Sequence, residues 1–160
     1  MDYDVYFMQL MAANGYITVS VDYDDIPRSY TSGCNEPLGF KAKSRAIFDP
    51  TLPNSVANQV CNDDTTPVDC AMGIATAGYS QGAHISIMAR NYNPQVTGNL
   101  VFGHGNVNTA EGGAFDVSCV NIDQLALPKE RRRSIVGEND QFFGRNYNGV
   151  LNQVSLLYYY

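Results

Sequence analysis

The chain has 160 residues, of which 44% are hydrophobic and 16% charged, and this composition fits one globular domain spanning residues 1–160 rather than a disordered tail. Its net charge of −6 opposes a phosphate backbone, so nucleic acid is excluded as an expected partner. No run of about 18 uninterrupted apolar residues occurs, so the sequence predicts no transmembrane segment.

The first 23 residues predict a helix followed by a strand. Residues 5–13 are rich in apolar helix formers and are followed by Asn14-Gly15, a common stop signal, so we expect a buried helix. In residues 16–23, β-branched side chains alternate with polar ones at a period of two, and a turn-rich segment follows. This second pattern predicts a strand.

The segment that follows contains more turn-forming residues. Residues 28–52 are rich in Gly, Pro and Ser and lack periodicity, which predicts a loop with a short helix around 41–48. A second short helix is predicted from Pro53 to Cys61.

The second half of the chain alternates strand and helix signals. Strand signals occur at 72–79, 99–103 and 133–137, a helix signal at 82–90 follows the first of them, and residues 150–157 have helical spacing. Small side chains on both faces of 72–79 are typical of a central parallel strand covered by helices. This order predicts an α/β fold with a mainly parallel sheet flanked by helices.

One dense basic run occurs, at Arg131-Arg132-Arg133, with Lys129 nearby. Because it directly precedes the apolar stretch 134–136, we interpret it as the solvated start of a strand. It therefore adds no partner to the prediction.

The four cysteines form an even set without the C-x-x-C spacing of a zinc site, so disulfides are favoured over a metal. Cys61 and Cys70 flank a turn-rich loop and are the favoured pair. The alternative is four buried thiols in a cytosolic protein. No secretory leader follows Met1, so we expect either an extracellular protein whose beginning is missing or a cytoplasmic one.

The stretch Gly78-Tyr79-Ser80-Gln81-Gly82 places a serine between a predicted strand and a predicted helix. At the carboxyl edge of a parallel sheet, such a turn holds the serine hydroxyl toward solvent in a strained conformation. Gly78 and Gly82 let strand and helix approach each other, and the backbone N–H of Gln81 points to where an oxyanion would form. Ser80 is therefore the candidate nucleophile.

With this elbow, the chain resembles the α/β-hydrolase superfamily over nearly all of its length. Residues 15–23 resemble the family's fourth strand with its preceding helix, 74–80 the fifth strand and nucleophile elbow, 99–103 the sixth strand and 133–140 the seventh. The resemblance implies a partial α/β-hydrolase fold and a serine hydrolase mechanism.

The resemblance also implies a catalytic acid. Ser-Ile-Val-Gly-Glu-Asn-Asp, residues 134–140, is similar to the family's strand-then-acid segment, which makes Asp140 the triad acid and leaves Asp123 and Glu138 as weaker choices. The alternative for Asp140 is a turn aspartate that accepts hydrogen bonds from local amides. Secreted esterases and lipases are the nearest likeness. The elbow is also found in cutinases, but their acid lies between two cysteines, which residues 137–143 lack.

In this superfamily the catalytic histidine follows the acid, yet the only two histidines here are His84 and His104. We interpret His84, one helical turn beyond Ser80, as a packed, hydrogen-bonded core residue. His104 follows a predicted strand, and we expect it to line the cleft or to serve as a substitute base.

The resemblance places the family's third strand, with its second oxyanion N–H, before Met1. It also places that strand between the fourth and the fifth, so residues 17–21 and 74–78 would lack the neighbour that lies between them. These expectations predict a fragment of a larger hydrolase, nearly inert on its own because the serine proton has no base.

The predicted function is therefore hydrolysis of small-molecule or lipid carboxylic esters through an acyl-enzyme. No metal or organic cofactor is expected, and Asp22, Asp24 and Asp25 are interpreted as solvated rather than as calcium ligands. The alternative is a non-catalytic protein of the same fold that binds a ligand or a partner. The sequence predicts no oligomeric state.

Overall fold

The computed structural model describes residues 3–23, 34, 39–103, 118–120, 124–137 and 156–159, and every structural statement below concerns this part of the chain. Its sheet has four strands in the order β1-β2-β3-β4: Ile74–Tyr79, Val96–Phe102, Arg132–Val136 and Leu156–Tyr159. All three pairings between neighbouring strands are parallel. The α/β fold with a parallel sheet packed against helices, predicted from the sequence, is confirmed.

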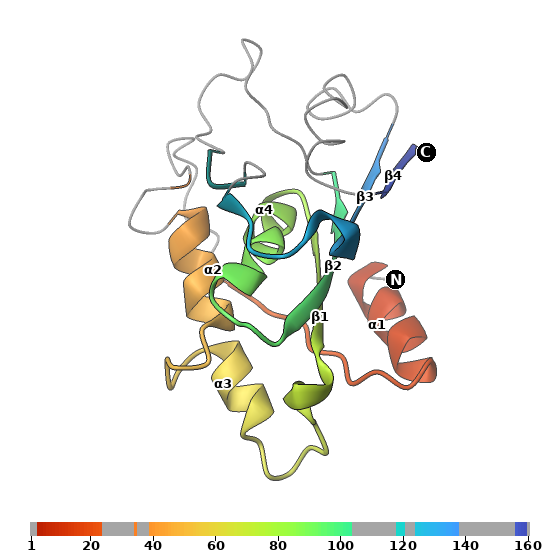
Figure 1. The fold of residues 1–160 in the computed structure, drawn as a ribbon. Coiled ribbons are helices and arrows are strands. Elements are labelled where there is room, and N and C mark those ends of the chain that lie inside the picture. Colours follow the sequence, from red (N-terminus) through yellow and green to blue (C-terminus); the bar gives the residue numbers. More distant parts are fainter. Residues whose placement is uncertain are drawn as a thin grey trace.

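Four α-helices accompany the sheet: α1 (Tyr3–Ala13), α2 (Phe40–Phe48), α3 (Val56–Cys61) and α4 (Gln81–Ile87). Single 3₁₀ turns are found at η1 (Cys70–Met72), η2 (Ala89–Asn91), η3 (Ser118–Val120) and η5 (Lys129–Arg131). Figure 1 shows α4, α2 and α3 on one side of β1 and β2 and α1 on the other. One face of the sheet is therefore packed against α4 and α2, and α1 touches the other face through the Phe7–Phe102 ring contact.

Alternation along β2 explains this two-sided packing, because successive side chains of a strand point to opposite faces. Val101 is fully buried in the core cluster beneath α4. Its neighbour Phe102 points to the other face, where its ring meets the ring of Phe7 from α1 edge-on, with centroids 6.3 Å apart.

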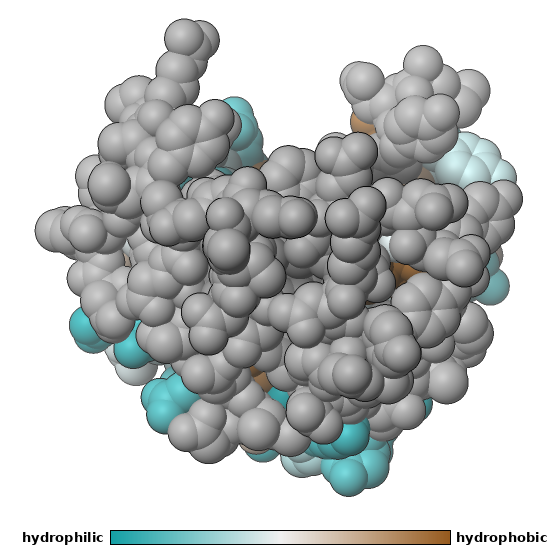
Figure 2. Space-filling view, turned by 90° about the horizontal axis from the view of Figure 1, so that it is seen from above, coloured by the Kyte–Doolittle hydropathy of each residue, from teal (hydrophilic) through white to brown (hydrophobic). Residues whose placement is uncertain are grey.

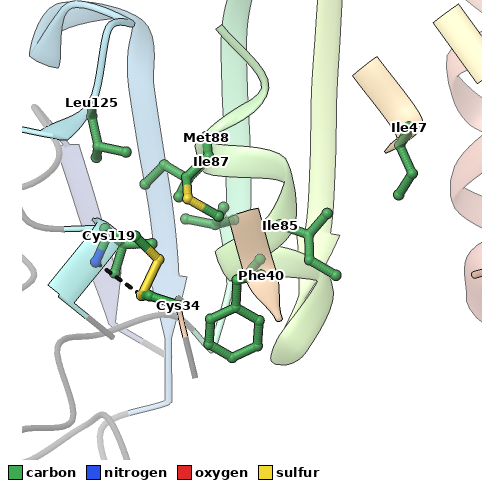
Figure 3. Close-up of a cluster of buried hydrophobic side chains, with 11 residues drawn as sticks. Cys34, Phe40, Ile47, Ile85, Ile87, Met88, Cys119 and Leu125 are labelled. Atoms are coloured by element: carbon green, nitrogen blue, oxygen red, sulfur yellow. Dashed lines mark hydrogen bonds between the residues drawn. A yellow bond between two sulfur atoms is a disulfide. The ribbon is translucent and has the colours of Figure 1, made fainter. Parts of the chain in front are cut away.

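The core lies between α4, α2 and the sheet, and Figure 3 shows its side chains converging from these elements. Ile87, Met88 and Val101 are at most 1% exposed. Burial of each such side chain stabilises the fold by about 1.5–3 kcal/mol. On the face seen in Figure 2, the visible surface of the described residues is mainly hydrophilic.

The predicted N-terminal helix forms, but it is not buried. Gly15 adopts φ 88° and ends α1 as its stop signal predicts. Only one face of α1, with Phe7, is partly covered, whereas Val5 and Leu10 remain about half exposed, at 48% and 49%. The apolar composition of residues 5–13 correctly predicted a helix, but the prediction that this helix is buried is wrong.

The predicted strand at residues 16–23 is wrong. These residues have no regular secondary structure, and Ile17 and Val19 are each 49% exposed. A β-branched alternation becomes a strand only when a neighbour accepts its backbone hydrogen bonds. Among the described residues, no backbone bond joins 17–22 to the sheet, although Val21 packs against the core.

Strand β1 is likewise not central: in the described sheet it is the edge strand, with β2 as its only neighbour. Its small side chains allow close packing of α4, which is the part of the prediction that holds. The second face of β1 is not enclosed, because Ala75 and Ala77 are exposed.

Two further predictions need correction. The helix predicted at 150–157 is contradicted at its end, where residues 156 and 157 begin β4 against the open side of β3. The basic run is not simply solvated either, because Arg132 in β3 is only 2% exposed and burial lowers the pKa of its guanidinium.

All four cysteines are paired, as Cys34–Cys119 and Cys61–Cys70. The favoured pair of the sequence analysis is thus confirmed, and the alternative of four free thiols is not. Within the described ranges, no helix is long and apolar enough to cross a membrane.

Candidate functional site

Ser80 occupies the turn between β1 and α4 and has an unusual backbone conformation, φ 50° and ψ −113°. Among the described residues it is the only one other than glycine with positive φ. Such a conformation costs about 1–3 kcal/mol and persists only where its surroundings impose it. The predicted strained turn is therefore present at the predicted residue.

Backbone hydrogen bonds hold Ser80 on both sides. Its N–H donates to the carbonyl oxygen of Phe102 in β2 at 3.0 Å, which extends the sheet ladder by one residue. Its carbonyl oxygen accepts from the N–H groups of Ala83 at 3.0 Å and His84 at 3.3 Å, which starts α4. The serine is thus fixed by the sheet before it and by the helix after it.

The close approach of strand and helix depends on Gly78. A Cβ on Gly78 would lie 2.2 Å from the carbonyl oxygen of Gly82, a backbone atom that cannot move aside. A Cβ on Gly82 would meet only the Tyr23 hydroxyl, at an ordinary contact distance of 3.5 Å. The expectation that both glycines are needed for the approach therefore holds sterically for Gly78 alone.

The outward side of the turn is open. Ser80 is exposed, and Tyr79 before it is 74% exposed. In the described part of the chain, the backbone N–H of Gln81 donates to no protein acceptor. A hydroxyl and a free backbone donor on adjacent residues are two of the groups that acyl transfer needs.

His84 lies one turn into α4 and faces inward. It is 4% exposed, its Nδ1 donates to the carbonyl oxygen of Ser80 at 3.0 Å, and its ring stacks on Phe40 with centroids 5.1 Å apart. Because the acceptor is a carbonyl, Nδ1 must carry the proton. The interpretation of His84 as a packed, hydrogen-bonded core residue is confirmed.

Sequence reasoning missed a lysine beside the elbow. Lys43 in α2 is only 8% exposed, its Nζ donates to Oε1 of Gln81 at 3.3 Å, and it lies 5.1 Å from the centroid of the Tyr23 ring. A signal existed, because Phe40, Lys43 and Ile47 share the i, i+3, i+7 spacing of one helix face. A lysine on the apolar face of a helix is an anomaly that sequence alone displays.

Four predicted site residues, Asp140, His104, Asp123 and Glu138, lie outside the described residues, as do Asp24 and Asp25. The strands that precede three of them are described, β2 before His104 and β3 before Glu138 and Asp140, and their register is informative. Tyr79 pairs with Phe102, and Phe102 with Ile135, so β1, β2 and β3 end side by side at one edge of the sheet. The chain thus leaves three neighbouring strands at the edge where Ser80 lies.

Comparison of the chain with protein-family models, with curated proteins and with solved structures yields no match. The class defined by these observations is an α/β protein with a strained serine at the carboxyl edge of a parallel sheet. The likeness to α/β-hydrolases remains a prediction based on the residues that carry it.

Proposed function

We propose that the chain is a serine hydrolase domain that acts on small-molecule or lipid carboxylic esters, with Ser80 as its nucleophile. The observation that carries the proposal is the φ 50°, ψ −113° conformation of Ser80. Backbone strain at a residue other than glycine concentrates at functional sites, because elsewhere glycine would occupy the position at lower cost.

In the proposed reaction, Ser80 Oγ attacks the ester carbonyl carbon while the carbonyl electron pair moves onto oxygen. The N–H of Gln81 donates to that oxyanion, and collapse of the intermediate breaks the bond to the alcohol and leaves an acyl-serine. Water then repeats the attack and releases the acid. Gly78 supports this step because it permits the turn that projects the hydroxyl.

The serine proton must pass to a base. His84 uses Nδ1 to bind the Ser80 carbonyl, which leaves that nitrogen unable to accept a proton. The resemblance assigns the base to a histidine oriented by Asp140, and His104, two residues after β2, is the substitute within this sequence.

Reaction with a fluorophosphonate probe and with p-nitrophenyl acetate tests the proposal. Because no base for the serine proton is assigned within the described residues, we expect labelling of Ser80 to be slow and ester turnover to be slight. Peptide mass spectrometry locates the label, which is expected to be lost in Ser80→Ala but not in Ser20→Ala, a matched change at another exposed serine. If turnover accompanies labelling, His104→Ala tests the substitute base. A folded chain that neither labels nor hydrolyses the ester contradicts the proposal.

The second candidate function is non-catalytic binding of a partner or ligand. One observation favours it: large apolar side chains are about half exposed on α1 and just beyond it, namely Val5, Tyr6, Leu10, Tyr16, Ile17 and Val19. Exposed apolar patches of this kind mark interaction surfaces. Absence of probe labelling from a folded chain supports this candidate.

An extracellular or otherwise oxidising location belongs to the same proposal. Two disulfides form among the four cysteines, and such bonds persist in oxidising compartments and are rare in the cytosol. Titration of free thiols in the protein isolated without reductant tests this: we expect none, and four reactive thiols after denaturation contradict it.

A further inference from the structure

Two side chains of α2 reach the residues that border Ser80. Phe40 stacks on His84, whose Nδ1 holds the Ser80 carbonyl, and three positions later Lys43 binds the side chain of Gln81. The partners on α4 are also three positions apart, so one face of α2 matches one face of α4. Side chains of α2 therefore contact both Gln81, which follows Ser80, and His84, which binds the Ser80 carbonyl oxygen.

The burial of Lys43 requires an explanation. Lysine is almost never buried unless its ammonium has partners, and ordering its long side chain costs conformational entropy. At 8% exposure, Lys43 has the Gln81 amide oxygen at 3.3 Å and the face of the Tyr23 ring at 5.1 Å. Tyr23 also approaches α4 directly, because its hydroxyl oxygen lies 3.5 Å from the position that a Cβ on Gly82 would take.

These contacts join three separate segments at one point. Tyr23 comes from the irregular segment after α1, Lys43 from α2 and Gln81 from the first turn of α4. Gln81 is also the residue whose backbone N–H is the candidate oxyanion donor. Fixing its side chain restrains the orientation of its peptide group in a turn that is already strained at Ser80.

We propose that Lys43 is a positioning residue for the oxyanion site: through its bond to the Gln81 side chain, it holds the Gln81 N–H in the orientation that stabilises the acyl-transfer intermediate. The proposal rests on the proposed role of Ser80. The proposal gives a role to Lys43, which the sequence motifs of the candidate site do not include. It also means that α2 helps to hold the oxyanion site in place.

The test is the second-order rate constant for fluorophosphonate labelling, measured per folded protein. Lys43→Met keeps the length of the aliphatic side chain and removes the ammonium, and we expect labelling about fivefold slower or more, the size of coupling between contacting residues. Lys43→Arg restores a donor and is expected to recover part of the rate. Lys41→Met, the same change two positions away on α2, is the control.

A double-mutant cycle separates positioning from packing. If Lys43 acts through Gln81, then Gln81→Leu slows labelling as Lys43→Met does, and the double variant is no slower than either single one. Where p-nitrophenyl acetate is turned over, the loss is expected in kcat with KM unchanged, because the contact serves the intermediate rather than the bound ester.

The outcomes distinguish the two proposals. No labelling of the folded parent chain overturns the role of Ser80, and the role of Lys43 with it. Normal labelling of Lys43→Met, or additive losses in the cycle, overturns the positioning role alone. Should Lys43→Met not fold, Gln81→Leu removes the same contact from a half-buried position, and an unchanged rate there overturns the proposal.

Discussion

Gly78 and Gly82 lie so close across the turn that a methyl group on Gly78 would overlap the peptide group of Gly82, 2.2 Å from its oxygen and 2.3 Å from its carbon. Both contacted atoms belong to the backbone of α4, so relief requires the helix to move away from β1. The position of α4 and the conformation of Ser80 therefore both depend on the absence of a side chain at Gly78.

Gly78→Ala is expected to displace α4, to abolish probe labelling at Ser80 and to lower the free energy of unfolding by about 3 kcal/mol. Gly82→Ala is the matched control, since its Cβ finds ordinary contact distances and alanine favours a helix over glycine by about 1 kcal/mol. Urea unfolding monitored by circular dichroism measures both. Equal losses in the two variants would contradict the assignment of the close approach to Gly78.

The strain at Ser80 predicts a conflict between stability and activity. Ser80→Gly removes the steric penalty of φ 50°, whereas Ser80→Ala keeps it, and both remove the hydroxyl. After the entropy that glycine gains in the unfolded chain is counted, Ser80→Gly is expected to be more stable than Ser80→Ala by about 1 kcal/mol. Chemical denaturation of the two variants decides, and an alanine variant as stable as the glycine variant would mean that the turn is unstrained.

Local signals in the sequence were sufficient for the elbow and for most elements. The conformation of Ser80, the α1 stop at Gly15 and the Cys61–Cys70 pair each depend on residues a few positions apart, so a short stretch of sequence contains their cause. Strands β2 and β3 were also found within a few residues of their ends, because their apolar runs are bounded by clear turns.

The errors about strands share a physical origin, which is that a strand needs a partner supplied by distant residues. Residues 16–23 have the alternation of a strand and no described neighbour to pair with, whereas residues 156–159 have little alternation and pair with β3. The place of β1 at the edge of the sheet is a property of the whole strand order. The burial of Lys43 has a local signal in the sequence, its place on the apolar face of α2, whereas its partner Gln81 is 38 positions away and has no such signal.

Beneath the elbow, a buried polar network joins β1, β2 and α4. Nδ2 of Asn99 donates to Oγ1 of Thr76 at 2.9 Å and to Oγ of Ser86 at 3.3 Å, while the Thr76 hydroxyl donates to the Ser86 carbonyl at 3.2 Å. Within the described part of the chain, the buried Oδ1 atom of Asn99 accepts no hydrogen bond, so the asparagine depends on the bonds that its Nδ2 donates. Loss of one of the Nδ2 bonds would leave a second polar group of Asn99 with fewer hydrogen bonds in a buried site.

Thr76→Val preserves the shape and β-branching of the side chain and removes the hydroxyl. We expect a loss of about 1–3 kcal/mol, because the Asn99 amide then loses its shortest bond in a buried site. Thr97→Val on β2 is the control, since the same change at an exposed position of the sheet is expected to be nearly neutral. Urea midpoints that shift equally in the two variants would refute a structural role for the network.

The two disulfides should differ in their effect on stability because they close chain segments of different length. Cys34 and Cys119 are 85 positions apart and lie at 0% and 1% exposure in the core, whereas Cys61 and Cys70 are 9 positions apart. Loop-closure entropy predicts a loss of about 4.5 kcal/mol for removing the long-range bond and about 2.5–3 kcal/mol for the short one.

Paired substitution to alanine, Cys34→Ala with Cys119→Ala and Cys61→Ala with Cys70→Ala, measures these losses by urea unfolding without reductant. The first variant is expected to lose more than the chain-entropy value, because Figure 3 shows the bond among core side chains, beside Ile87 and Met88. A larger loss from removing Cys61–Cys70 would contradict the loop-closure prediction. It would mean that the segment between Cys34 and Cys119 is already compact in the unfolded chain, so that the Cys34–Cys119 bond removes little entropy from it.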